Sequence, residues 1–322
     1  RVFLLGLALV LVLLMASVSL VSAQSTTVLR VATTSGVTTW DPSLSFSTEA
    51  IYLANIYEPL LWVDSDGEFV PALATDWSVS DDGLTWTFNL RQDVTFHDGA
   101  ALTADAVVRS IQRHQEIGGA SFIWFPLDSI EAVDDSTVQM NLGYPAPMEL
   151  IASSLYGAWI VSPDALDAAA ADESYFEAGI GAGSGPYMLA DYTPDAEVVL
   201  AALPDYWGGW EDDQFQNILF SIIADDLVQE QMLLGGQVDF ATRLPSSSYA
   251  SFASNDSFTV LDYATFFNYV GFFNVNNPPL DDVRVRQAIS YAIPYDDVIA
   301  VGVEGRGTQA RGPVVDLDEA DY

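Results

Sequence analysis

The stretch PALATDWSVSDDGLTWTFNLR, residues 71–91, decides how this chain is expected to fold. In its second half apolar and polar side chains alternate over eight residues, with the apolar positions at Leu84, Trp86, Phe88 and Leu90. Strict alternation is typical of a β-strand with one face in a core, because successive side chains point to opposite faces. Asp81-Asp82-Gly83, directly before it, is a turn sequence. The stretch therefore predicts a half-buried strand that follows a tight turn.

Helices and strands are expected on both sides of this stretch. Thr103 opens a helix through about Glu116, and Ser162-Pro163 opens another, because serine caps helices well and proline suits the first helical position. Asp225 and Gly235 bound a third helix. Further helices are expected at 48–61 and 283–293, and strands at 28–32, 129–133, 137–142, 187–192, 197–202, 217–223, 237–241, 258–264 and 266–275. The two kinds of element mix without strict alternation, which predicts a mixed α/β fold of the α+β class.

Composition excludes several classes of function. The chain has 322 residues, of which 45 are acidic and 10 basic, and its formal charge is −35. Such a chain repels polyphosphate, so nucleic-acid binding is not expected. It contains no cysteine and two histidines, His97 and His114, which excludes disulfides, thiol chemistry and cysteine zinc sites. The length suggests about two domains.

The first residues indicate export. Val2 to Met15 form an apolar run, and Val21-Ser22-Ala23 fits the small-x-small pattern that precedes a signal-peptidase cut. We expect residues 1–23 to be a signal peptide, with cleavage after Ala23 and a periplasmic or extracellular mature protein. An uncleaved membrane anchor stays open as an alternative, because residues 2–23 are long enough to span a bilayer.

Motifs of catalysis are not found in the sequence. The glycine-rich run 179–185 lacks the Gly-Lys ending of a phosphate loop, and Ser184 lacks the flanking glycines of a nucleophile elbow. Phe96-His97-Asp98-Gly99 is typical of a turn. We therefore expect no catalytic residue, no metal site and no cofactor. A secreted hydrolase that acts on peptides or glycans through its carboxylates remains the alternative.

Residues 71–91, together with 94–99 and 102–105, resemble the signature region of the extracellular solute-binding proteins of family 5. These are the peptide/nickel-type binding proteins of ABC importers, similar to dipeptide- and oligopeptide-binding proteins. The resemblance continues in family order through Trp40-Asp41-Pro42 and the segments 56–60, 160–163, 183–187, 205–207, 236–239 and 279–289. One departure is Pro294, which should end the last of these helices early.

The resemblance implies a two-lobe fold of the periplasmic-binding-protein type II, with an extra inserted domain. Domain I would comprise residues 24–63 and 181–275, and the domain II insert would comprise residues 64–180. Residues 276–322 would begin domain III, the C-terminal lobe, most of which would lie beyond Tyr322.

The same resemblance implies a function in transport. The protein would be a monomer that captures a peptide or a related small solute between two lobes and delivers it unchanged to an ABC permease. Family members line the cleft with two segments, which here are Phe46, Ser47 and Thr48, and Phe267, Asn268 and Tyr269. The alternation of Phe267 and Tyr269 is equally typical of a strand that packs into a core, and that alternative stays open.

Overall fold

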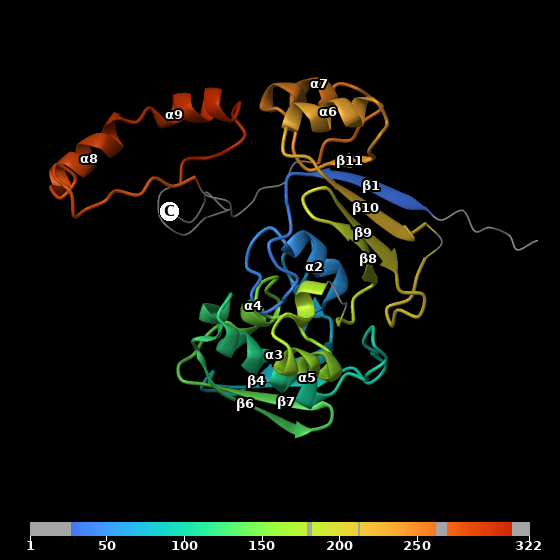
Figure 1. Ribbon diagram of the computed structural model, residues 1–322. Helices are drawn as coiled ribbons and strands as arrows, with labels where there is room; N and C mark the ends of the chain where they lie inside the picture. The colour runs from blue at the N-terminus through green and yellow to red at the C-terminus, as the bar shows by residue number, and fades with distance from the viewer. Residues whose placement is uncertain (1–26, 179–181, 212, 262–268, 311–322) are drawn as a thin grey trace, which may run out of the picture.

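The computed structural model describes residues 27–178, 182–211, 213–261 and 269–310, and two β-sheets dominate it (Figure 1). The first sheet has the strand order β11-β1-β10-β9-β8. Strand β1 runs parallel to its neighbours β10 and β11, whereas β9 is antiparallel to its neighbours β10 and β8. Its strands are β1 (Val28–Thr33), β8 (Tyr187–Thr193), β9 (Glu197–Ala202), β10 (Asn217–Ile222) and β11 (Phe240–Ala241).

The second sheet contains most of the stretch 71–91. It is antiparallel, with the order β4-β5-β7-β6, and comprises β4 (Ala74–Val79), β5 (Thr85–Leu90), β6 (Leu127–Asp134) and β7 (Thr137–Leu142). The predicted alternation is confirmed in β5, where Trp86, Phe88 and Leu90 are buried. Helix α3 (Ala104–Ile117) packs on this sheet, and the Thr103 hydroxyl caps it by accepting a hydrogen bond from the Ala106 N–H at 3.2 Å.

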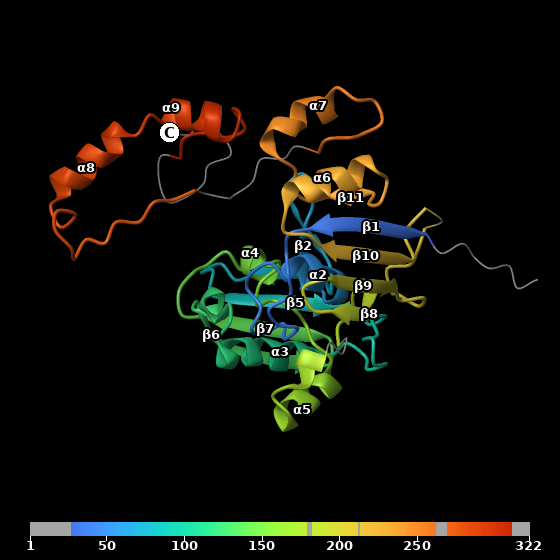
Figure 2. The same cartoon turned by 45° about the horizontal axis from the view of Figure 1, so that its top comes forward.

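The other elements are short, and most agree with the predictions. Figures 1 and 2 show α2 between the two sheets and α6 beside β11 and β1. The elements are β2 (Leu61–Val63), β3 (Phe69–Pro71), α2 (Ala50–Ile56), α4 (Met148–Ala152), α5 (Pro163–Ala171), α6 (Asp226–Leu234), α7 (Tyr249–Ala253), α8 (Val283–Ala292) and α9 (Tyr295–Asp297), with helices of other types at Ser121–Trp124, Tyr175–Ala178, Ser246–Ser248 and Val298–Gly302. No helix of the described residues is long and apolar enough to span a membrane.

Three predicted elements differ from the structure, one helix and two strands. The helix expected over 48–61 ends at Ile56, and Tyr57 is already extended. The helix cannot resume at Glu58, because Pro59 disfavours helical backbone in the residue before it and Glu58 pairs instead with Ile160. The strands expected at 258–264 and 266–275 are absent from their described parts, 258–261 and 269–275. Residues 269–275 are largely exposed and lead into the arm of α8 and α9, which Figures 1 and 2 show apart from both sheets. A strand requires a neighbour that pairs with it.

Two hydrophobic clusters share one segment of chain. Ala158 and Ile160 belong to the cluster of the four-stranded sheet, whereas Trp159 and Val161 belong to the cluster of the five-stranded sheet. Because these residues alternate between the two cores, the segment joins the sheets into one unit. Helix α5 packs in the cluster of the five-stranded sheet although it lies within the predicted insert, 64–180. The domain limits themselves stay a prediction.

Glu58 is the buried polar centre of this junction. Its carboxylate accepts hydrogen bonds from Ser184 Oγ at 2.7 Å, Tyr206 Oη at 2.8 Å and Trp207 Nε1 at 2.8 Å. Burial raises the pKa of Glu58, and hydrogen bonds from Trp207, Ser184 and Tyr206 act in the opposite direction. The carboxylate thus links residues that are more than a hundred positions away in the sequence.

Gly183 and Gly185, in the described part of the glycine-rich run before β8, pack closely at the same junction. A Cβ at Gly183 would lie 1.9 Å from the carbonyl oxygen of Ile56, and a Cβ at Gly185 would lie 2.6 Å from that of Asn55. Real side chains do not approach backbone so closely. The glycines therefore serve the contact between two segments, in keeping with the absence of a phosphate-loop motif.

We expect Glu58→Ala to lower the free energy of unfolding by about 2–4 kcal/mol, because three donors lose their acceptor in a buried place. Glu58→Gln should cost less, since its amide oxygen still accepts. Glu173, an exposed residue, supplies the control, and Glu173→Ala should change stability by no more than about 0.5 kcal/mol. Urea unfolding followed by tryptophan fluorescence measures all three. Equal stability of Glu58→Ala and Glu173→Ala would show that the junction does not depend on the carboxylate.

A second prediction concerns pH and His114, which is fully buried in α3 and bonded through Nε2 to the Trp159 carbonyl at 2.7 Å. Burial lowers the pKa of His114 from 6.5 to about 4. As the pH falls below 6.5, the unfolded chain therefore takes up this proton before the folded chain does. The stability contributed by the neutral imidazole is full above pH 6.5 and is lost as the pH falls through about 4.

Between pH 7 and pH 5, this effect should lower the free energy of unfolding of the wild type by about 2 kcal/mol more than that of His114→Gln. Other titrating groups contribute equally to both proteins and cancel in the difference. Urea unfolding at a series of pH values gives the two slopes. Parallel slopes would mean that the pKa of His114 is the same in the folded and unfolded chains.

Candidate functional site

The carboxyl ends of the parallel strands form the edge at which a ligand is expected. In open sheets with parallel strands, ligands bind outside these ends where the chain switches from one side of a strand to the other. Here β10 leads through α6 to β11, on the opposite side of β1. The edge is regular, because the Ile223 N–H donates to the Thr33 carbonyl at 2.7 Å and the Thr242 N–H donates to the Ala32 carbonyl at 2.9 Å.

The predicted site residues Phe46, Ser47 and Thr48 lie beside this edge. Thr48 Oγ1 donates a hydrogen bond to the carbonyl of Gly36, three residues beyond the end of β1, at 3.3 Å. All three side chains are exposed, and Phe46 has 58% of its surface free. Two hydroxyls, exposed backbone and one aromatic ring are thus available to a ligand at one place.

An ion pair fixes the start of this segment. Arg113 on α3 donates to both carboxylate oxygens of Asp41, from Nη1 and from Nη2, each at 2.6 Å, and Nη1 also reaches Ser43 Oγ at 2.6 Å. The side chains of Arg113 and Asp41 are only 14% and 4% exposed. The guanidinium also lies over the ring of Phe176, 4.8 Å from its centroid. A planar, bidentate and desolvated pair of this kind holds its partners in one geometry.

Close backbone contact holds the same turn from the other side. A Cβ at Gly119, just after α3, would lie 2.1 Å from the Ser43 carbonyl oxygen, so only glycine permits this approach. The buried carboxylate of Glu49 accepts from the Thr38 N–H at 3.1 Å and from Ser45 Oγ at 3.3 Å. The loop after β1 and the segment before α2 are therefore tied to each other as well as to α3.

The second predicted group of site residues is described only in part. Phe267 and Asn268 lie outside the described residues. Tyr269 is 83% exposed, in the segment that leads to α8. The predictions for these three residues therefore stay predictions. The sequence analysis also missed Arg113 and Gly36. Only the Trp40-Asp41-Pro42 turn, whose Asp41 pairs with Arg113, gave a signal for Arg113.

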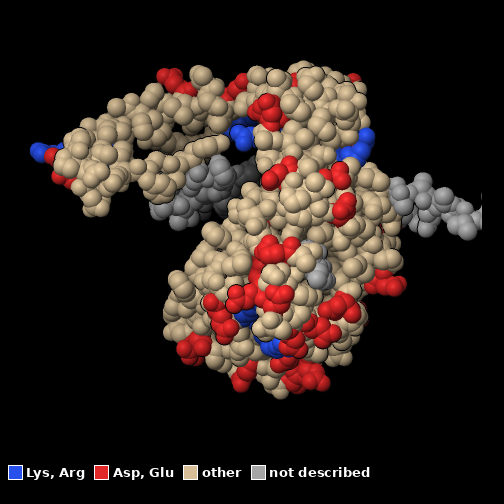
Figure 3. Space-filling model, in the orientation of Figure 1, with Lys and Arg blue, Asp and Glu red and all other residues tan. Residues whose placement is uncertain are grey.

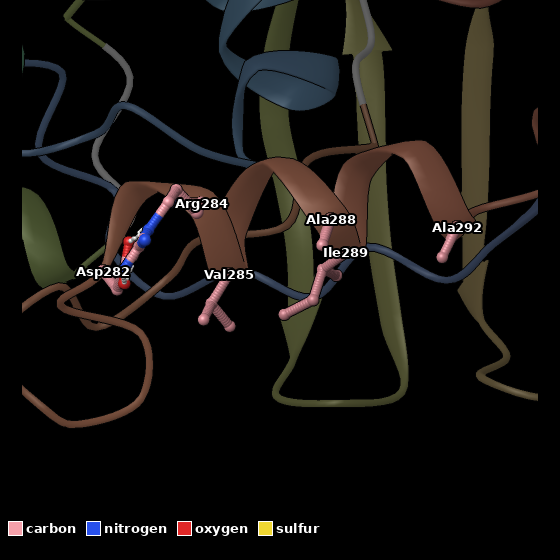
Figure 4. Close-up of a pocket in the computed structure, with 6 residues that line it drawn as sticks. All are labelled: Asp282, Arg284, Val285, Ala288, Ile289 and Ala292. Atoms are coloured by element: carbon pink, nitrogen blue, oxygen red, sulfur yellow. Dashed lines mark hydrogen bonds and ion pairs between the residues drawn. The ribbon is translucent and has the colours of Figure 1, made fainter.

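The arm carries a hollow that we do not assign to the site. This space of about 570 Å³ is lined by Asp282, Arg284, Val285, Ala288, Ile289 and Ala292 (Figure 4). All six belong to α8 or directly precede it, and most of them are exposed. One helix face cannot enclose a ligand, because binding sites surround most of the ligand's surface.

Charged groups elsewhere show structural roles. Among the described residues, no three His, Asp or Glu side chains are grouped so as to hold a metal ion. His97 is bonded through Nε2 to the Gly185 carbonyl at 2.8 Å, and the turn predicted at Asp98-Gly99 is confirmed by a bond from the Ala100 N–H to Asp98 Oδ1 at 3.0 Å. Figure 3 shows acidic side chains gathered over the lower part of the molecule, where α3 and α5 lie.

The sequence matches a known family over most of its length. The pattern of the bacterial extracellular solute-binding proteins, family 5 Middle, matches residues 68–321. The chain is 32% identical over 244 residues to the probable D,D-dipeptide-binding periplasmic protein DdpA of Escherichia coli. This match covers 75% of the present chain and 47% of DdpA. It is 30% identical over 267 residues to the dipeptide-binding protein of the same organism, with coverages of 76% and 49%. The chain thus spans about half the length of these relatives.

Solved structures share the fold. A periplasmic binding protein of Helicobacter pylori, DppA, in complex with the peptide STSA superposes with a TM-score of 0.77 at 24% identity, over 89% of this chain and 60% of that one. NikZ of Campylobacter jejuni, in complex with Ni(L-His), gives 0.77 at 23% identity, over 89% and 57%. Identities this low show the fold alone, which is the predicted periplasmic-binding-protein type II fold. Since the family pattern covers more than half of the chain, this protein belongs to the bacterial extracellular solute-binding proteins of family 5.

Proposed function

We propose that this protein captures a small solute, with short peptides as the first candidates, and passes it unchanged to an ABC permease. The solute would lie on the carboxyl edge of β1, β10 and β11, against Phe46, Ser47 and Thr48. Phe267, Asn268 and Tyr269 would contribute from a second segment. The family consists of binding proteins rather than enzymes, and we extend this property to the present chain.

One observation carries the proposal. The exposed segment 46–48 lies beside the strand edge and is held there by the buried Asp41–Arg113 pair, the Glu49 carboxylate and the contact at Gly119. A binding surface that is ordered before the ligand arrives avoids the entropy cost of ordering it afterwards. Its exposed backbone and hydroxyls suit an extended peptide, which can be held through main-chain hydrogen bonds with little regard to side chains.

The proposal extends to the surroundings of the protein. We infer that residues 1–23 direct export and are removed after Ala23, so that the mature chain works outside the cytoplasm as a monomer. The domain limits 24–63 with 181–275, 64–180 and 276–322 belong to the same proposal. The extracellular location of the family supports this inference.

We expect the full chain to bind members of a library of di-, tri- and tetrapeptides with saturable heats in isothermal titration calorimetry. Mass spectrometry of the mixture after incubation should return every peptide intact, because nothing in the proposed site cleaves it. Progressive turnover of a peptide would contradict the proposal and favour the hydrolase alternative. Absence of saturable binding to any member would contradict peptide capture.

A matched pair of variants locates the site. Phe46→Ala should weaken binding about 5–30-fold, since an aromatic contact typically contributes about 1–2 kcal/mol. Phe215 is also exposed, at 40%, but it precedes the amino end of β10, on the opposite edge of the sheet. Phe215→Ala should therefore leave the dissociation constant within about twofold of the wild type. Equal effects of the two variants would place the ligand elsewhere.

A further inference from the structure

Arg243 differs from the other arginines that the structure describes. Its guanidinium makes no hydrogen bond or ion pair with any described residue, and the side chain is exposed. The remaining described arginines each contact a carboxylate, a carbonyl or an aromatic ring, namely Arg30, Arg91, Arg109, Arg113, Arg284, Arg286 and Arg306. In a chain with 45 acidic residues and 10 basic ones, a guanidinium that contacts none of the described groups is unexpected.

The backbone at Arg243 is fixed to the strand edge that forms the candidate site. Arg243 follows the end of β11 by two residues, and its N–H donates to Gln229 Oε1 at 3.3 Å. Gln229 is fully buried in α6, and its Nε2 donates to the carbonyl of Ile223, directly after β10, at 2.7 Å. One buried amide therefore ties the carboxyl ends of β10 and β11 together, with the end of β1 between them.

Arg243 and the segment 46–48 therefore belong to one edge. The Thr242 N–H bonds to the Ala32 carbonyl on β1, and Thr48 Oγ1 bonds to the carbonyl of Gly36, on the loop that leaves β1. The ends of the two parallel neighbours thus lie on either side of the loop that Thr48 contacts. The arrangement thus places the backbone of Arg243 at the same edge as the hydroxyls and the aromatic ring of the segment 46–48.

The charges near this edge leave the guanidinium available. Asp225 also follows β10, but its carboxylate accepts the capping hydrogen bonds of α6, from the Leu227 N–H at 2.9 Å and the Val228 N–H at 3.1 Å. The formal charge of −35 repels anionic solutes at long range. A site for such a solute therefore needs a local cation, and the planar guanidinium fits a carboxylate with two parallel hydrogen bonds.

We propose that Arg243 binds a carboxylate of the captured solute and makes the site selective for ligands that bear one. This inference rests on the proposed function and narrows its ligand class. In a peptide the carboxylate can belong to the C-terminus or to an acidic side chain. The two sources present the same chemistry to Arg243.

Paired probes separate these sources in calorimetric titrations of the full chain. Trialanine and its C-terminal amide differ only at the terminus, and amidated Ala-Glu-Ala and Ala-Gln-Ala differ only at the side chain. The wild type should prefer the carboxylate member of at least one pair by about tenfold or more. Arg243→Gln should reduce that preference to less than about threefold, and Arg243→Lys should keep part of it, since a lysine retains the charge without the fork.

Two controls make the result specific. Arg109→Gln removes the same charge from the insert, where Arg109 pairs with Asp167, and should retain the wild-type preference. The melting temperature of Arg243→Gln should match that of the wild type, because the replaced group is exposed and bonds to no described residue. The preference should also shrink as salt is added, as expected for an exposed charge contact.

The outcomes distinguish the two proposals. If the wild type binds none of the four probes and no library peptide, peptide capture is overturned and the assignment of Arg243 falls with it. If the wild type binds but shows no preference in either pair, or if Arg243→Gln keeps the full preference, only the role of Arg243 is overturned. Loss of preference in Arg109→Gln as well would attribute the effect to net charge and would overturn the local assignment.

Discussion

The ion pair between Asp41 and Arg113 is the interaction on which the candidate site depends. It joins the turn that precedes the exposed segment 46–48 to a helix that packs on the other sheet. Removal of one member of such a pair leaves a charge buried without a partner, at a typical cost of about 3–5 kcal/mol. The pair is therefore weak as a source of net stability but strong as a constraint on geometry, since almost any displacement of the turn would expose or unpair it.

Packed contacts at a second place join the two sheets into one support. Residues 158–161 point alternately into both hydrophobic clusters, and Glu58 and the glycines at 183 and 185 bring the two crossing segments into direct contact. A hinge needs a few residues that can change their backbone angles without breaking packed contacts. The packed contacts of the described junction leave little of that freedom.

Local patterns in the sequence predicted most elements, because their causes are local. Period-two alternation located β5, and the hydroxyl of Thr103 located the start of α3. The strands expected at 258–275 were wrong where the structure describes them, since apolar composition cannot reveal whether a neighbour exists to pair with. For the site, the family resemblance supplied Phe46, Ser47 and Thr48. The partnership of Asp41 with Arg113 spans 72 positions and could not be inferred from either motif alone.

Arg243 lacks the contacts that the other described arginines make, and the surrounding backbone explains why. A folded chain with a large excess of carboxylates offers many partners to each guanidinium. An unpaired guanidinium therefore requires a backbone position that holds it away from the carboxylates. Gln229 has this effect at Arg243, because its buried amide fixes the chain at the strand ends, and the nearby Asp225 is already committed to capping α6. The acidic surface and the Arg243 guanidinium then act together. The acidic surface repels anionic ligands, and Arg243 would offset this repulsion at the strand edge. Under the proposal, a ligand's carboxylate would therefore determine whether the ligand is selected.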